Sequence, residues 1–199
     1  MDIINNNDLL LEWKKELVAV CDNLAKNPVY DLNLDFYVFQ SGVISNPPLF
    51  IIGTNPGGTE TYTEKNAANH REGRSVNDLG DGDTNLFIAH PEWKISQGIL
   101  SLFSTNKLRP ILEQSVITNL VYFNTSDFSE FERRKGAKEA IEFCTNSTKK
   151  LIDILQPKNI LLLGNHAPKH LSLYFDFQME DVLRTRDDRT ALIRKTTID

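Results

Sequence analysis

Three short apolar runs, each bounded by turn-forming residues, constrain the fold of this chain more than any other feature. The runs cover residues 49–52 (LFII), 115–121 (SVITNLV) and 159–164 (NILLLG). Uninterrupted apolar runs of this length are typical of strands that are covered on both faces, as in a parallel sheet. A weaker run at residues 191–196 predicts a fourth strand.

Helical periodicity separates these runs. Apolar residues recur every three or four positions from Leu9 to Leu24, over residues 95–103, and from Ala137 to Leu155. Strands that alternate with helices define the α/β class, in which right-handed crossovers bring the carboxyl ends of parallel strands to one edge. We therefore expect a three-layer α/β/α fold with a central four-stranded, mostly parallel sheet.

Length and composition fit one domain. The chain has 199 residues, of which 40% are hydrophobic, and we expect a single domain over residues 1–199. A long insertion at about residues 59–92 is rich in Asn, Gly, Asp and Thr. Loops of this length are usually functional or disordered, and we interpret this one as a flap or lid.

Membrane, metal and disulfide-rich classes are not indicated. No stretch reaches the roughly 18 apolar residues of a membrane span, and the N-terminal residues lack a signal pattern, so we expect a cytoplasmic protein. Cys21 and Cys144 lack metal-ligand spacing, which predicts reduced core thiols. We expect no cofactor and no metal; the weak alternatives are oxygen-rich groups in the insertion, namely His70 with Glu72, and Asp78 with Asp81 and Asp83.

The net charge limits how the chain can meet nucleic acid. A formal net charge of -5 argues against a broad nucleic-acid-coating surface, because non-specific affinity comes from Lys and Arg that neutralise phosphates. A local basic groove stays open at residues 133–135 (RRK) and among the basic residues of 184–195. The alternative is a solvated surface of mixed charge.

Each of the three strong runs ends in polar or turn-forming residues. The first continues as Gly53, Thr54, Asn55, Pro56, Gly57 and Gly58, the second contains Thr118 and Asn119, and the third continues as Gly164, Asn165 and His166. Because the carboxyl ends of parallel strands lie side by side, we expect Asn55, Asn119 and His166 to face one cleft. This convergence is the main functional indication.

Each of these features also has a purely structural interpretation. The amide of Asn119 either matches the edge of a pyrimidine or bonds nearby backbone at a strand end. The turn after the first run either receives an anion on the N–H groups of Gly57 and Gly58 or only lets the chain leave the strand. His166 is a candidate general acid, a phosphate donor or a helix-capping neighbour.

Taken together, the motifs resemble those of the uracil-DNA glycosylase superfamily. GTNPGG at residues 53–58 resembles the G-x-N-P-G motif of its mismatch-specific and single-strand-selective branches. VITNLV at residues 116–121 resembles the strand whose asparagine reads the uracil edge, and ILLLGNHAPK at residues 160–169 resembles the third-strand sequence.

The resemblance implies hydrolysis of the bond between deoxyribose and a base that is flipped out of DNA. Asn55 would then position the attacking water and Asn119 would recognise the base, with His166 as the second catalytic candidate. An amide does not readily accept a proton, so Asn55 would orient water rather than act as a base. The expected substrate-binding set is completed by Gly53, Thr54, Pro56, Gly57, Gly58 and Asn165, with Tyr62 as the aromatic that stacks on the base.

The sequence departs from the superfamily pattern in two places. The C-terminal His-Pro-Ser motif, whose histidine stabilises the departing base, has no counterpart at residues 194–199, and the one His-Pro pair is His90-Pro91 in the insertion. Three explanations of this difference are open: the chain is truncated, another group such as His166 replaces the histidine, or catalysis has been lost. The aromatic residue that stacks on the base also has no clear counterpart. Tyr62 is the candidate, and the alternative is that Tyr62 is a half-buried loop residue with a packing role.

These observations predict an enzyme. We expect a monomeric DNA glycosylase that removes a deaminated or modified base, a pyrimidine in preference, with DNA as its partner. The alternative is a catalytically inactive glycosylase-like protein that binds a nucleotide, DNA or a protein. A third interpretation, a nucleotide or sugar-phosphate enzyme, depends on phosphate binding at Gly57 and Gly58.

Overall fold

The computed structural model describes residues 6–67, 75–82, 84–164, 166–173, 180–183 and 193–195. Its longer helices are α1 (Asn6–Lys26), α4 (Lys94–Leu102) and α7 (Ala137–Leu155). Shorter ones are α2 (Tyr62–Ala67), α3 (Leu86–Ala89), α5 (Arg109–Glu113), α6 (Phe128–Phe131) and α8 (His166–Leu171). The strands are β1 (Phe50–Gly53), β2 (Val116–Asn119), β3 (Ile160–Leu162), β4 (Glu180–Leu183) and β5 (Ile193–Lys195).

The three strong apolar runs form one parallel sheet in the order β2-β1-β3. Phe50 lies in register with Val116 on one side and with Ile160 on the other, and at the far end Gly53 lies opposite Asn119. All residues of β1 and β2 are buried, which explains why neither run shows the alternation of a half-exposed strand. Helices and strands therefore surround an open, all-parallel sheet of three strands, which is consistent with the predicted α/β class.

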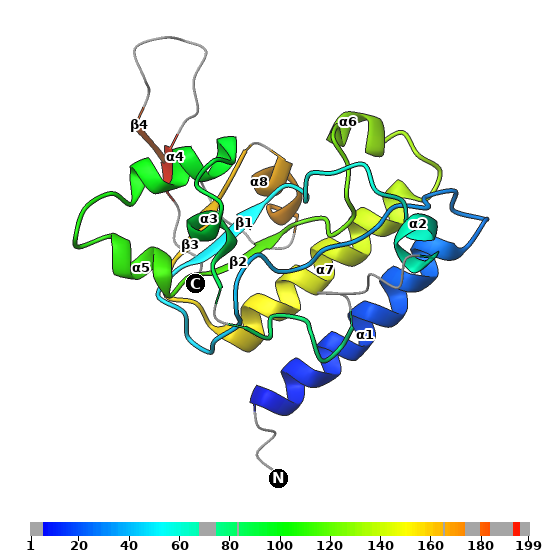
Figure 1. Cartoon of the computed structure of the whole chain (residues 1–199), viewed down its shortest axis with the longest axis horizontal. Coiled ribbons are helices and arrows are strands. Elements are labelled where there is room, and N and C mark those ends of the chain that lie inside the picture. The colour runs from blue at the N-terminus through cyan, green and yellow to red at the C-terminus, as the bar shows by residue number, and fades with distance from the viewer. Residues whose placement is uncertain are drawn as a thin grey trace.

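Successive residues of β1 face two different cores. Phe50 and Ile52 pack with residues of α1 and α7, including Leu17 and Leu151. Ile51 packs with Ile117 and with the helices that lie on the other face, through Phe87 of α3, Ile99 of α4 and Leu112 of α5. Figure 1 shows the sheet between these two groups of helices.

The expectation of a fourth strand in the central sheet is not met. Residues 193–195 do form a strand, β5, but it pairs antiparallel with β4 in a separate two-stranded sheet. The two strands are close in the sequence, and a short connection allows antiparallel pairing, whereas parallel pairing requires a long crossover. In place of a fourth strand, residues 36–39 cover the outer edge of β2 through isolated antiparallel bridges from Phe36 to Phe123 and from Phe39 to Thr118.

Several described residues of the insertion pack against the rest of the domain. Thr61 forms a bridge with Leu34, Leu79 is fully buried, and Asn85 caps α3. Residues 68–74 and 83 lie outside the described residues, so the interpretation as a flap or lid stays a prediction. None of the helices in the described ranges combines the length and the apolar character that crossing a membrane requires.

Candidate functional site

The carboxyl edge of the sheet brings Asn119 against the end of β1. The amide of Asn119 lies so close to Gly53 that a methyl group at position 53 would overlap its Oδ1. Asn119 is buried, with 7% of its surface exposed, and no hydrogen bond joins its side-chain amide to another described residue. The alternative interpretation expected this amide to bond nearby backbone. No such hydrogen bond is present among the described residues.

Asn55 is held in one orientation by two backbone carbonyls. Its Nδ2 donates to Thr125 O at 2.7 Å and to Pro56 O at 2.9 Å. Because an amide nitrogen carries two N–H groups, both are used, and the side-chain oxygen Oδ1 is left as an acceptor. The side chain is half-buried, so this acceptor lies at the margin of the core.

The segment that follows β2 crosses the end of β1 and links the predicted residues. The N–H groups of Leu120 and Val121 donate to Gly53 O and Thr54 O, and that of Thr125 donates to Pro56 O. Farther along the segment, the ring of Phe128 lies 4.6 Å from that of His166, centroid to centroid. The sequence indicated the strand ends but gave no sign of this crossing segment.

The turn after β1 requires glycine at position 58 but not at position 57. Gly58 has a φ of +125°, and a methyl group there would lie 2.6 Å from Glu60 Oε2. Nothing lies within 4 Å of the corresponding position at Gly57. A carboxylate beside Gly58 repels an anion, and this argues against the phosphate-binding interpretation of the turn.

The third strand reaches the same edge from the other side of β1. Gly164 has a φ of +79°, and a methyl group there would lie 3.3 Å from Thr54 Oγ1. His166 begins α8, so His166 and Asn119 flank β1 on opposite sides. Asn165 lies outside the described residues.

His166 belongs to an aromatic cluster with Phe128 and His170. The ring of His170 lies 6.2 Å from Phe128, and its Nε2 is 3.9 Å from Glu132 Oε1. Burial lowers the pKa of His170, and Lys169 lowers it further, while Glu132 acts in the opposite direction. Through Phe128, whose ring is tilted by 54° from that of His166, His166 contacts the segment whose Thr125 also holds Asn55.

Tyr62 makes the contacts of a packing residue. It begins α2, is 8% exposed, and donates a hydrogen bond from its hydroxyl to Asp22 Oδ1 of α1 at 2.9 Å. These contacts match the alternative interpretation of Tyr62 as a packing residue, except that Tyr62 lies in a helix and not in a loop. A role in stacking on a base stays a prediction.

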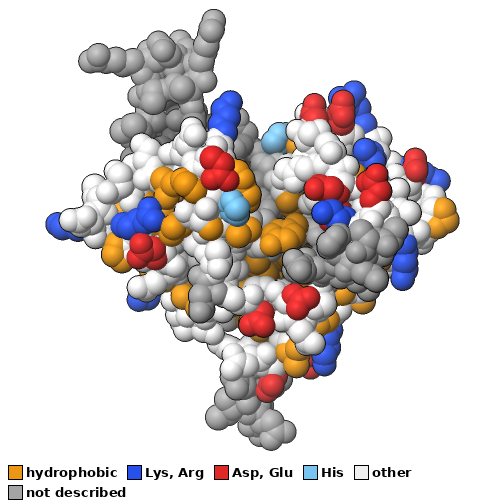
Figure 2. Space-filling view, viewed as in Figure 1, with side chains coloured by type: hydrophobic (Ala, Val, Ile, Leu, Met, Phe, Trp, Pro, Cys, Tyr) orange, Lys and Arg blue, Asp and Glu red, His pale blue; other side chains and the backbone are white. Residues whose placement is uncertain are grey.

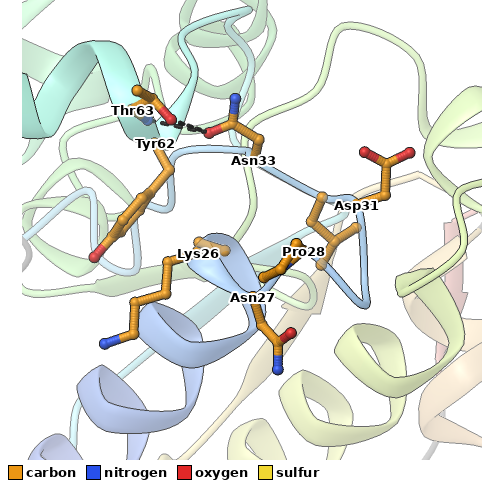
Figure 3. A pocket seen from close by; sticks show the side chains of 9 residues that line it. Lys26, Asn27, Pro28, Asp31, Asn33, Tyr62 and Thr63 are labelled. Carbon is orange, nitrogen blue, oxygen red and sulfur yellow. Dashed lines mark hydrogen bonds between the residues drawn. The ribbon is translucent and has the colours of Figure 1, made fainter.

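A cavity of about 530 Å³ lies beside Tyr62, where α1 ends. The polar ends of Lys26, Asn27 and Asp31 point in different directions around it (Figure 3). These three side chains therefore form no converging set of ligand-binding groups.

Charge and apolar surface are distributed without a basic stripe on the face shown in Figure 2. Lys and Arg side chains there alternate with Asp and Glu, and hydrophobic side chains gather over α4 and α5. Exposed apolar residues of these helices and their flanks are Trp93, Ile95, Leu102 and Leu108. Among the residues that the structure describes, no three His, Cys, Asp or Glu side chains are grouped to hold a metal; His70, Glu72 and Asp83 fall outside them.

Two residues of this site were missed by the sequence interpretation, namely Asn124 and Thr125. Both are buried, with 7% and 9% of their surfaces exposed, and both belong to the crossing segment. Their only signal is a polar pair directly after the apolar residues 120–123 (LVYF).

Comparison with known proteins finds no family model that matches this sequence and no match among curated proteins.

Proposed function

We propose that this protein is a DNA glycosylase that hydrolyses the N-glycosidic bond of a deaminated or modified base, a pyrimidine in preference, flipped out of DNA. The observation that carries the proposal is the arrangement of two amides at the carboxyl edge of a parallel sheet. Asn119 lies against Gly53 of β1, and Asn55 follows two residues later with its Oδ1 as the remaining acceptor. The resemblance of three ordered motifs to the uracil-DNA glycosylase superfamily supports the same function.

Each amide has a distinct role in this proposal. Asn119 offers one acceptor and two donors to the edge of a pyrimidine, and it binds no other described residue. Asn55 accepts a hydrogen bond from the attacking water, which its fixed orientation holds in place. Neither group removes a proton, so the reaction relies on departure of the base, for which His166, at the start of α8 on the other side of β1, is the candidate donor.

Alkaline cleavage of end-labelled oligonucleotides tests the proposal. The substrates carry uracil, mismatched thymine, hypoxanthine or hydroxymethylated pyrimidines, and the proteins are wild type, Asn55→Ala and Asn119→Ala. We expect strand breaks with wild type for at least one pyrimidine, and their loss in both variants. Asn106→Ala is the control, because Asn106 is exposed and lies in a turn away from the sheet edge. Intact strands with every substrate would contradict the proposal.

The acidic balance of the chain, with a formal net charge of -5, favours a second candidate, a glycosylase-like protein that binds a nucleotide, DNA or a protein without catalysis. In that case the oligonucleotides stay intact, and one of them shifts the melting temperature of wild type but not of Asn119→Ala. Turnover that Asn55→Ala abolishes would rule this candidate out.

A further inference from the structure

A second cavity, of about 150 Å³, lies between the insertion and the segment that covers the outer edge of β2. Two backbone hydrogen bonds join its walls: Val43 N–H donates to Gly80 O at 3.0 Å, and Leu86 N–H donates to Gln40 O at 2.8 Å. The N–H of Gln40 donates in turn to Ile117 O of β2 at 2.9 Å. The cavity is therefore fixed to the edge of β2 that faces away from β1.

Gln40 lines this cavity with a side-chain amide that forms no hydrogen bond to another described residue. The residue is buried, with 9% of its surface exposed. In the described ranges, the enclosed polar side-chain atoms without a partner belong to Ser96, Asn124 and His170, so the amide of Gln40 is accessible from the cavity. Because buried polar groups are nearly always hydrogen-bonded, this amide calls for a partner from outside the chain.

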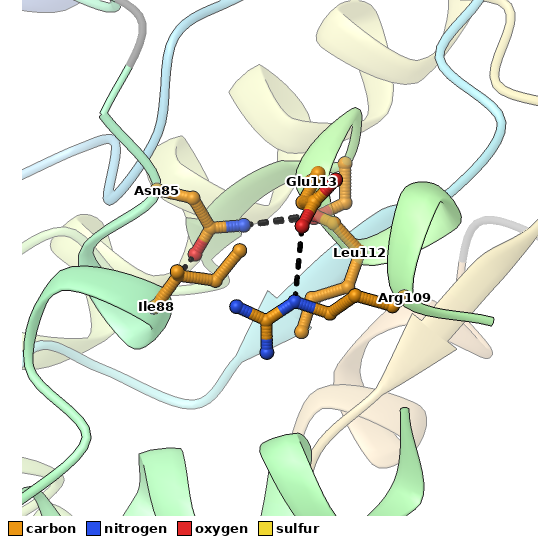
Figure 4. A network of polar contacts seen from close by, with 6 residues as sticks. Asn85, Ile88, Arg109, Leu112 and Glu113 are labelled. Atoms are coloured by element: carbon orange, nitrogen blue, oxygen red, sulfur yellow. Dashed lines mark hydrogen bonds and ion pairs between the residues drawn. The ribbon is translucent and has the colours of Figure 1, made fainter. Parts of the chain in front are cut away.

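Asn85 shows what a buried amide forms in the same part of the fold when the chain supplies its partners. It is 7% exposed, its Nδ2 donates to Leu112 O at 2.8 Å, and its Oδ1 accepts from the N–H groups of Phe87 and Ile88 (Figure 4). The chain thus satisfies one buried amide and leaves that of Gln40 to the contents of the cavity.

The charged residues among those that line the cavity are both acidic, namely Asp78 and Asp81. Both are exposed, which places them at its mouth, whereas Gln40 lies at its base. Lys14 of α1 does not line the cavity, but its charge interacts with Asp81: burial lowers the pKa of Lys14 and this carboxylate raises it. One lysine offsets at most one of the two carboxylates, so the cavity favours a cation over a phosphate or a carboxylate.

The other lining residues favour an organic cation over a metal ion. Tyr37 and Phe39 line the cavity, and aromatic rings attract organic cations. Over the part of the chain that the structure describes, no three His, Cys, Asp or Glu side chains are grouped to hold a metal. A volume of roughly 150 Å³ is enough for a benzene molecule, and a planar guanidinium group is smaller.

We infer that this cavity binds a guanidinium group, which belongs either to a free guanidino compound or to an arginine side chain of a partner. Gln40 Oε1 accepts a hydrogen bond from one of its N–H groups, and Asp78 and Asp81 balance its charge. The inference does not depend on the proposed glycosylase function, because the cavity shares no lining residue with the candidate site.

Isothermal titration calorimetry with methylguanidinium chloride tests the inference, and methylurea serves as the uncharged ligand of the same shape. We expect saturable binding of methylguanidinium to one site and no binding of methylurea at the same concentrations. Gln40→Met removes the amide at nearly constant length and should weaken binding at least about tenfold. Asp81→Asn should also weaken binding, whereas Gln40→Glu should strengthen it.

Thermal unfolding separates a binding role of Gln40 from a structural one. Gln40→Met removes no hydrogen bond of the side chain, so its melting temperature should stay near that of wild type. Asn85→Leu is the matched control, since it removes existing hydrogen bonds at a similar degree of burial and should lower the melting temperature. A fall for Gln40→Met as large as that for Asn85→Leu would assign Gln40 a structural role and overturn the inference.

The titrations also distinguish the occupants of the cavity. The inference would be overturned by the absence of saturable methylguanidinium binding, or by equal affinities of wild type and Gln40→Met, either of which would leave a cavity that holds only water. Equal binding of methylurea, or displacement of methylguanidinium by Ca²⁺, would likewise overturn it. A blocked tripeptide that contains arginine identifies the source: tighter binding than methylguanidinium assigns the site to a partner's side chain, and weaker binding assigns it to a free guanidino compound.

Discussion

Gly53 lies at the sheet edge where there is no room for a Cβ atom. Its α-carbon lies against the amide of Asn119, so Gly53→Ala forces that amide to move, although the backbone of residue 53 does not require glycine. A displacement of about 1 Å in a positioning group can cost roughly 100-fold in rate. Under the glycosylase proposal, we therefore expect Gly53→Ala to lower base excision by at least about tenfold, measured by alkaline cleavage.

Gly57→Ala is the matched control for this prediction. Nothing lies within 4 Å of a methyl group at position 57, and the residue is exposed, so activity and melting temperature should match wild type. Equal activities of the two alanine variants would show that the contact between Gly53 and Asn119 is unimportant.

His170 predicts a loss of stability in acid. Burial lowers its pKa below the ordinary 6.5, so the folded state binds a proton less readily than the unfolded state. Its contribution is therefore complete above about pH 6.5 and is lost as the pH falls through the lowered value. In urea unfolding at about pH 7.5 and about pH 5, the free energy of unfolding should fall less for His170→Gln than for wild type. Parallel losses in both proteins would contradict this.

At the scale of elements, the contact between α1 and α7 encloses both cysteines. Cys21 and Cys144 are fully buried, and Trp13 Nε1 of α1 donates to Ser147 O of α7 at 2.9 Å. Burial raises the pKa of the Cys21 thiol well above its usual value, and the neighbouring Cys144 raises it further. The reactive thiolate is thus disfavoured while the two helices are packed.

We expect neither thiol to react with Ellman's reagent in the native protein and both to react in urea. Ser101→Cys, on the exposed side of α4, is the positive control and should add one rapidly reacting thiol. Rapid native-state labelling of the wild-type protein would mean that α1 and α7 separate readily.

Elements whose burial pattern is regular could be predicted from the sequence. The helical spacing and Pro157 predicted both ends of α7. The three apolar runs predicted the parallel sheet, in which Asn119 lies opposite Gly53. The pairing of β5 with β4 could not be predicted, because residues 180–183 (EDVL) lack a strand pattern. Asn124 was missed because the path of an irregular crossing segment leaves no periodicity in the sequence.

At the scale of the whole molecule, charge limits any contact with DNA. The chain carries a formal net charge of -5, and basic side chains alternate with acidic ones on the face of Figure 2. A surface of this kind neutralises few phosphates, so the glycosylase proposal requires that recognition depends on the flipped base rather than on the backbone.

Under the glycosylase proposal, we expect weak binding to undamaged duplex and a shallow salt dependence. The slope of log affinity against log salt should be less steep than about -3, measured by fluorescence anisotropy over a range of NaCl concentrations. A steeper slope would reveal a basic surface outside the face shown in Figure 2.

The strand order β2-β1-β3 also determines how long β1 stays unpaired while the chain is being synthesised. The central strand, β1, leaves the ribosome first, and its two partners follow only after residues 116 and 160. Until then, an apolar strand with two open edges is exposed in the nascent chain, and such edges favour association between chains. We therefore expect the nascent chain to be most prone to association with other chains until β3 has emerged and the edges of β1 are paired.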